Sequence, residues 1–102
     1  LVAPAEIENH LIEHDSVKAA QVVAVRIHDK MRAYAFIIPT NNKPPEQEEL
    51  MDFCLEGLAK FKVPAIFHYL NEFPTIKSPN GKKIQRSKLR EIAEAETRKK
   101  LI

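Results

Sequence analysis

Glycine is scarce in this chain, and only Gly57 and Gly81 occur among its 102 residues. Loops that cradle phosphate, whether of the P-loop or the dinucleotide-binding type, need several glycines at fixed spacing, and so does the turn that presents a catalytic serine. We therefore expect no nucleotide-binding loop in this chain. ATP, if it is a ligand at all, is not expected to be held tightly by these residues alone.

Cysteine and long apolar runs are lacking as well. The single cysteine, Cys54, excludes an internal disulfide framework and agrees with a reducing, intracellular compartment, for which the cytoplasm is the expectation. No apolar run approaches the roughly 18 residues of a membrane span, so we expect no transmembrane segment. The chain begins without methionine and its length suits one domain, residues 1–102, which we expect to be a piece of a larger protein.

A clear excess of one charge sign is also missing, because 16 basic residues are balanced by 14 acidic ones. Nucleic-acid binding needs clustered positive charge. The basic stretch near the C-terminus is interleaved with Glu91, Glu94 and Glu96 and has no aromatic pair to stack bases, so no nucleic-acid partner is expected. The four histidines lie in separate segments without cysteine or acidic partners at ligand spacing, so no metal site is expected.

The sequence does contain alternating helical and extended patterns. Pro4 suits a first helical turn, after which Ile7, Leu11 and Ile12 recur at helical spacing. A valine-rich segment predicts a strand, which we expect to be central, and the short connection after it permits only an antiparallel hairpin. The predicted elements are a helix at 4–14, strands at 17–27 and 33–38, a helix at 46–60, a strand at 66–70 and a helix from about 87. This order predicts an α+β domain, with a small sheet of about three strands, including the hairpin, covered by helices.

The second predicted helix carries an apolar stripe at helical spacing. The members of the stripe are Leu50, Phe53, Cys54, Leu58 and Phe61. We interpret Cys54 as a small core residue and not as a nucleophile, because free cysteine is among the most frequently buried residue types.

Turn chemistry and positive charge coincide in the stretch from Phe73 to Lys83. It ends in Gly81-Lys82-Lys83, where glycine lets the backbone turn sharply and a lysine projects a compact charge with three donors. Such a group suits an anion that is held by another surface. A solvated basic loop without function is the alternative interpretation.

Three stretches, in this order along the chain, resemble the adenylate-forming superfamily of acyl- and aryl-CoA synthetases, luciferases and peptide-synthetase adenylation domains. They are Pro4-Ala5-Glu6-Ile7-Glu8 with His14-Asp15-Ser16-Val17, then Leu58-Ala59-Lys60-Phe61-Lys62-Val63-Pro64, and then Lys83-Ile84-Gln85-Arg86-Ser87-Lys88-Leu89-Arg90-Glu91. Together they extend over nearly the whole chain and resemble the small C-terminal domain of these enzymes.

The resemblance implies that this domain closes over a large N-terminal domain that binds ATP, Mg²⁺ and a carboxylic acid. The intact enzyme would be an AMP-forming acid-thiol ligase. It would first form an acyl-adenylate and pyrophosphate, and the small domain would then swing so that the thiol of CoA displaces AMP. The isolated chain is expected to be inactive. Two alternatives stay open: an adenylation domain that loads a carrier-protein thiol, and a non-catalytic interaction or regulatory module of the same fold.

In this family a Gly-Lys turn supplies a lysine to the first half-reaction only, and Gly81 is the residue that would present it here. The chain has one residue more than the usual pattern. Alignment from Gly81 selects Lys82, whereas alignment from Ile84-Gln85-Arg86 selects Lys83, which we favour because the downstream match is longer. The predicted hairpin between strands 17–27 and 33–38 looks a few residues short and lacks the family's usual glycine, so the resemblance by itself does not place a CoA contact there.

Overall fold

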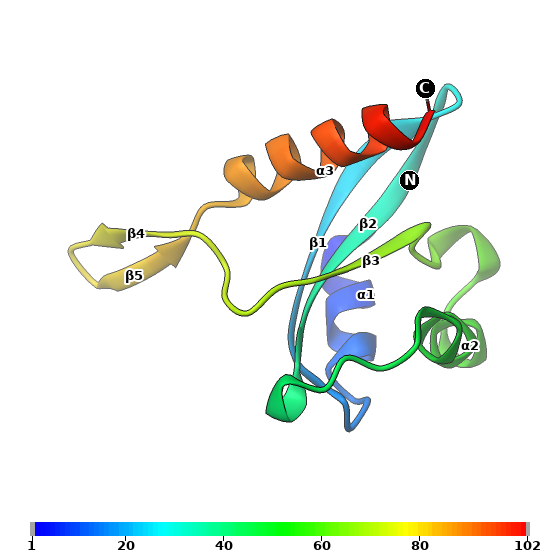
Figure 1. Cartoon of the computed structure of the whole chain (residues 1–102), viewed down its shortest axis with the longest axis horizontal. Helices are drawn as coiled ribbons and strands as arrows, with labels where there is room; N and C mark the ends of the chain where they lie inside the picture. The colour runs from blue at the N-terminus through cyan, green and yellow to red at the C-terminus, as the bar shows by residue number, and fades with distance from the viewer. Residues whose placement is uncertain (1, 102) are drawn as a thin grey trace.

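The computed structural model describes residues 2–101, with side chains up to residue 99, and it has a three-stranded sheet, helices on both faces of that sheet and a separate two-stranded hairpin (Figure 1). In chain order the elements are α1 (Pro4–Leu11), β1 (Val17–Ile27), β2 (Lys30–Pro39), η1 (Thr40–Asn42), α2 (Gln47–Gly57), η2 (Lys60–Lys62), β3 (Ile66–Tyr69), β4 (Thr75–Ser78), β5 (Gly81–Ile84) and α3 (Arg86–Leu101). The α+β prediction is confirmed. None of the helices in residues 2–101 is long and apolar enough to cross a membrane.

The central strand of the main sheet is β2, because the strand order is β1-β2-β3. β1 and β2 form the predicted antiparallel hairpin, whereas β3 runs parallel to β2. The turn between β1 and β2 places His28 and Asp29 at positive φ, as two-residue hairpin turns that match the twist of their strands require. The prediction that 17–27 forms a central strand is wrong. β1 is an edge strand, and its apolar residues are buried on both sides because helices cover both faces of the sheet.

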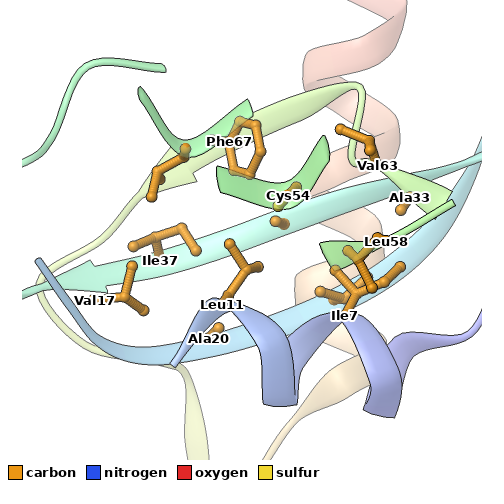
Figure 2. Packing of buried hydrophobic residues seen from close by; sticks show 13 residues of the cluster. Ile7, Leu11, Val17, Ala20, Ala33, Ile37, Cys54, Leu58, Val63 and Phe67 are labelled. Carbon is orange, nitrogen blue, oxygen red and sulfur yellow. The ribbon is translucent and has the colours of Figure 1, made fainter. Parts of the chain in front are cut away.

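These helices create two apolar clusters. α1 and α2 pack on one face over the cluster shown in Figure 2, and α3 packs on the other face, where Leu89 and Ala93 meet the second cluster. The first cluster consists of Ile7, Leu11, Val17, Ala20, Val22, Ala33, Ala35, Ile37, Leu50, Cys54, Leu58, Val63 and Phe67. Burial raises the pKa of the Cys54 thiol to about 11, so the thiolate does not form near neutral pH. The interpretation of Cys54 as a core residue is confirmed.

Two predicted helices end earlier than expected, and each early end exposes an apolar residue. α2 ends at Gly57, and the extended backbone of Leu58 breaks the helical phase. Leu58 is buried as predicted, but Phe61 is 66% exposed, so its assignment to the buried stripe is wrong. α1 ends at Leu11, which leaves Ile12 about half exposed instead of on the buried face.

The predicted loop before the last helix contains the second sheet, formed by β4 and β5. The two strands are antiparallel and are joined by Pro79-Asn80. Gly81 follows at a φ of 117°, a conformation that side chains disfavour and glycine adopts freely. The hydroxyl of Ser78 donates to the carbonyl of Gly81 at 2.8 Å and closes the turn. The hairpin is therefore an ordered element, which the sequence pattern did not predict.

Candidate functional site

The β4–β5 hairpin projects from the rest of the domain, as Figure 1 shows. Its base is held by Phe73 and Ile84, which pack against the apolar cluster beneath α3, and by the N–H of Gln85, which donates to the carbonyl of Pro74 at 2.9 Å. Beyond this base most residues are exposed. The hairpin thus presents its side chains to solvent or to another surface, and not to its own domain.

The two candidate lysines lie on opposite faces of β5, because neighbouring residues of a strand point to opposite sides. Lys83 is opposite Ile76 on β4, whereas Lys82 is opposite Lys77. Both lysines are exposed. Lys83 lines a hollow of about 340 Å³ together with Ile76 and residues 84–87, and Lys82 is not among the residues that line it. Of the two, Lys83 is the one that combines a free ammonium group with a concave surface beside it.

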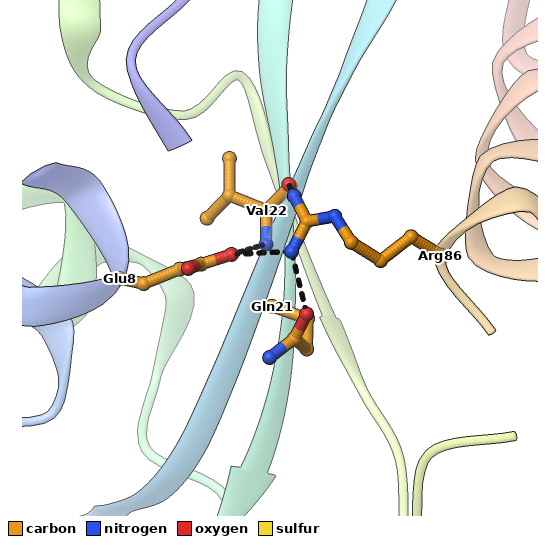
Figure 3. Close-up of polar contacts among 4 residues, drawn as sticks. All are labelled: Glu8, Gln21, Val22 and Arg86. Carbon is orange, nitrogen blue, oxygen red and sulfur yellow. Dashed lines mark hydrogen bonds and ion pairs between the residues drawn. The ribbon is translucent and has the colours of Figure 1, made fainter. Parts of the chain in front are cut away.

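Arg86, the first residue of α3, ties the root of the hairpin to the edge of the main sheet (Figure 3). Its guanidinium donates to Oε2 of Glu8 at 3.2 Å, to Oε1 of Gln21 at 2.7 Å and to the carbonyl oxygen of Val22 at 2.5 Å. The same Oε2 of Glu8 accepts the N–H of Val22 at 2.7 Å. We call these four residues the clasp. It joins α1, β1 and α3 at one point, on the outer edge of β1.

A second surface lies at the end of the molecule opposite the β4–β5 hairpin. It combines positive charge with an exposed aromatic ring. It is a hollow of about 500 Å³, which we call the basic hollow, and it is lined by Lys30, Met31, Arg32, Lys60 and Phe61. Phosphate oxygens attract such cations, and a nucleotide base can stack on an exposed ring. This combination suits a phosphorylated nucleotide.

The sequence interpretation missed the basic hollow because it assigned Phe61 to a buried stripe. One signal could have revealed it. Gly57 is a residue type that often ends a helix, and a helix that stops there no longer places Phe61 on the buried stripe. In the structure Nζ of Lys62 lies 5.8 Å from the centroid of the Phe61 ring.

The histidines of α1 and the turn after it have packing partners. The Nε2–H of His10 donates to the carbonyl of Phe53 at 2.8 Å, and the two rings stack with centroids 4.5 Å apart. Nδ1 of His14 accepts the N–H of Ser16, while its Nε2 lies 2.8 Å from Oε2 of Glu49. These contacts fix the rings between α1 and α2, and they account for both histidines without any ligand.

Comparison with known proteins matches residues 6–82 to the family described as the AMP-binding enzyme C-terminal domain. The match ends inside the hairpin, at Lys82. Among curated proteins, the 2-succinylbenzoate--CoA ligase of Geobacillus kaustophilus is 38% identical over 74 residues, which are 72% of this chain and 15% of that protein.

Solved structures agree with the family match. The anthranilate CoA ligase AuaEII in complex with anthranoyl-AMP has a TM-score of 0.78 at 33% identity, over 92% of this chain and 18% of that one. The O-succinylbenzoate coenzyme A synthetase of Bacillus subtilis, in complex with AMP, has a TM-score of 0.73 at 34% identity, over 87% of this chain and 17% of that one. The chain spans less than a fifth of the length of each of these relatives. The predicted family is confirmed, and this chain belongs to the C-terminal domains of AMP-binding enzymes.

Proposed function

We propose that this chain is the mobile C-terminal domain of an AMP-forming acid-thiol ligase and that it supplies Lys83 to the first half-reaction. The intact enzyme would convert a carboxylic acid, ATP and CoA into acyl-CoA, AMP and pyrophosphate. The observation that carries the proposal is an exposed lysine on a projecting hairpin in a domain of this family. The similar proteins are named as ligases that join CoA to 2-succinylbenzoate or anthranilate, which supports a carboxylic acid substrate. The partner surface would be an N-terminal domain upstream, in a cytoplasmic enzyme.

Lys83 suits the adenylation step because that step brings two anions together. The carboxylate oxygen attacks the α-phosphorus, the bond to the bridging oxygen breaks, and pyrophosphate leaves with that electron pair. An ammonium group held in place before the reaction stabilises the charge that collects on the phosphate oxygens, and no proton transfer is required of it. Gly81 sets the turn from which β5 leads to this lysine. Lys82, on the opposite face of β5, is the alternative.

ATP and Mg²⁺ are assigned to the upstream domain, because this chain has no phosphate-binding loop and its described residues form no metal-binding cluster; the basic hollow is an open surface and is not expected to hold ATP tightly by itself. Mg²⁺ prefers oxygen ligands, above all carboxylates and phosphates. In the described part of the chain, no three acidic, histidine or cysteine side chains gather where they could hold a metal ion. Gly57 and Gly81 are too few for a phosphate-binding loop.

The isolated chain is therefore expected to fold but not to catalyse. Thermal unfolding should be cooperative, because apolar clusters fill both faces of the sheet, and the midpoint should not shift when ATP and Mg²⁺ are added. Calorimetry that found micromolar ATP affinity for these 102 residues would contradict the assignment of the nucleotide to the upstream domain.

The basic hollow supports CoA as the thiol substrate. CoA carries phosphates and an adenine ring, and the basic hollow offers three cations and the exposed ring of Phe61. It lies at the end of the molecule opposite the hairpin, so both surfaces cannot face one reaction centre in a single orientation of the domain. A swing between two orientations would bring the hairpin in for adenylation and the basic hollow in for thioester formation.

Replacing Phe61 with alanine in the full-length protein is expected to raise the KM for CoA about tenfold, because stacking of a base on an aromatic ring contributes roughly 1–3 kcal/mol. Carboxylate-dependent pyrophosphate exchange should not change. Pantetheine, which has the thiol but no nucleotide, should be used equally by Phe61→Ala and the unaltered protein. Leu55→Ala, which removes another exposed apolar side chain, is the matched control. Equal losses with CoA and pantetheine would contradict a nucleotide contact at Phe61.

The same measurements test the two alternative functions, an adenylation domain that loads a carrier-protein thiol and a non-catalytic module of the same fold. A carrier-protein thiol is borne on a phosphopantetheine arm without adenine, so an enzyme that loads a carrier protein should transfer the acyl group to that arm better than to CoA and should tolerate Phe61→Ala. A full-length protein that catalyses no pyrophosphate exchange with any carboxylic acid would instead favour a non-catalytic module.

A further inference from the structure

We infer that Arg86 and Glu8 are positioning residues for the adenylation step, because through the clasp they set where the hairpin and Lys83 stand relative to the body of the domain. The inference rests on the proposed function of the hairpin. Neither residue is proposed to touch the substrate. Their effect would pass along the chain, since Arg86 is three residues beyond Lys83 and both line the same hollow.

The hairpin has little else that could fix its direction. β4 pairs with β5 in a sheet of their own, separate from the main sheet. The apolar contacts of Phe73 and Ile84 lie at its base, and such contacts are non-directional, so they hold the base in place without setting an angle. The bonds of Arg86 are directional. They come directly after the base and reach partners on two other elements, α1 and β1.

The partner side of the clasp is itself held in place. The side chain of Glu8 is only 19% exposed, and the N–H of Val22 donates to the same carboxylate oxygen that meets Arg86. The carbonyl of Val22 points to the same side of β1 as its N–H and accepts a hydrogen bond from Arg86. Because β1 is an edge strand, this residue has no further strand to pair with on that side. The clasp therefore anchors the root of the β4–β5 hairpin to the unpaired edge of the main sheet.

The chemistry of arginine fits this task better than that of lysine. A planar guanidinium donates from several N–H groups in fixed directions, whereas an ammonium is a compact point charge on a flexible stem. Arg86 uses Nη1 for the side chains of Glu8 and Gln21 and Nη2 for the backbone of Val22. Three acceptors met by one rigid group define an orientation as well as a distance.

The test is Arg86→Gln in the full-length protein, with both half-reactions measured separately. We expect pyrophosphate exchange to slow by about 10–10²-fold with an unchanged KM for ATP, because a reacting group displaced by about 1 Å can cost 10²-fold. Thioester formation from supplied acyl-adenylate and CoA should stay within about twofold, since the basic hollow is at the other end of the molecule.

Lys88→Gln is the matched control: it lies on the same helix, loses the same charge and is outside the clasp. A Glu8→Gln variant and the double variant complete a cycle, and the double variant should be no slower than the slower single one.

Each other outcome counts against the inference. Equal losses in the two half-reactions would mean that Arg86 only holds the domain together, and unchanged exchange would mean that the clasp does not place the hairpin. Losses that multiply in the double variant would mean that Glu8 and Arg86 act separately. If Lys83→Ala slows exchange and Arg86→Gln does not, the inference fails while the proposed function stands. If neither Lys83→Ala nor Lys82→Ala slows exchange, the proposed function fails and the inference falls with it.

Discussion

Replacing Lys83 with alanine in the full-length protein is expected to slow acyl-adenylate formation by about 10²–10³-fold, the usual scale for the loss of one preorganised electrostatic contact to a transition state. The physical reason is that this step brings two anions together. A positioned ammonium group stabilises their encounter, and bulk water cannot substitute for that group once the site has closed. Carboxylate-dependent exchange of labelled pyrophosphate into ATP measures this step alone.

The control for Lys83→Ala is Lys82→Ala, which removes an identical charge one residue away. Because Lys82 points from the opposite face of β5 and is solvated, its loss should change the exchange rate by no more than about twofold. If Lys82→Ala abolishes exchange and Lys83→Ala does not, the catalytic lysine is Lys82 and the mechanism is otherwise the same. If both variants exchange normally, the hairpin has no part in adenylation.

Replacing Gly57 with alanine is expected to destabilise the chain by about 1–3 kcal/mol, the cost of forcing an extra methyl group against a ring that is held in place. A Cβ at Gly57 would lie 2.1 Å from Cε1 of His10, well inside van der Waals contact. The ring of His10 cannot move away freely, because it stacks on Phe53 and donates to the carbonyl of that residue. The helix itself would gain about 1 kcal/mol from alanine, so the prediction is that the clash outweighs helix propensity.

Urea unfolding of Gly57→Ala in two backgrounds separates these effects. In the otherwise unaltered chain the free energy of unfolding should fall. In a His10→Ala background the methyl group has room, so Gly57→Ala should be neutral or stabilising by up to about 1 kcal/mol. Glu56→Ala, at an exposed position of the same helical turn, controls for changes in helix propensity. An equal loss in both backgrounds would show that His10 is not the obstacle.

Much of the secondary structure could be predicted from the sequence, because periodicity is a local signal. The strand at 17–27 has the predicted bounds, and the last helix starts within one residue of its predicted start. The order of strands could not be predicted in the same way. A strand with apolar residues on both sides has the same pattern whether it is central or an edge strand covered by helices on both faces, and β1 is the second case.

The length of α2 was a different kind of error. The apolar spacing continues past Gly57, and the spacing alone predicted a helix to residue 60. Glycine near a helix end is a common stop signal, and it was present in the sequence. The end of the helix at Gly57 turns Phe61 outward and so creates the basic hollow. Periodicity gave no sign of this surface, because the same spacing would be expected for a buried residue.

The candidate site, too, could be predicted from the sequence only in part. Gly81, Lys82 and Lys83 could be identified because turn chemistry and charge occur together in adjacent residues. The pairing of β4 with β5, which separates the two lysines onto opposite faces, was missed although Asn80-Gly81 is a common hairpin-turn signal, because the residues that flank it lack an alternating apolar pattern. The clasp could not be predicted at all, since Arg86 meets partners 64 to 78 positions earlier in the chain. Glu8 and Arg86, taken separately, are typical of charged residues on helix surfaces.

The most direct test of the account is to supply chemically made acyl-adenylate and CoA to full-length Lys83→Ala and to measure thioester formation. We expect a rate within about twofold of that of the unaltered protein, while pyrophosphate exchange is slowed at least about 10²-fold, because the lysine serves the first transition state and has left the site before the second. Thioester formation slowed as much as exchange would contradict the account, since a domain that presents one end to each half-reaction cannot lose both through a single side chain on the hairpin.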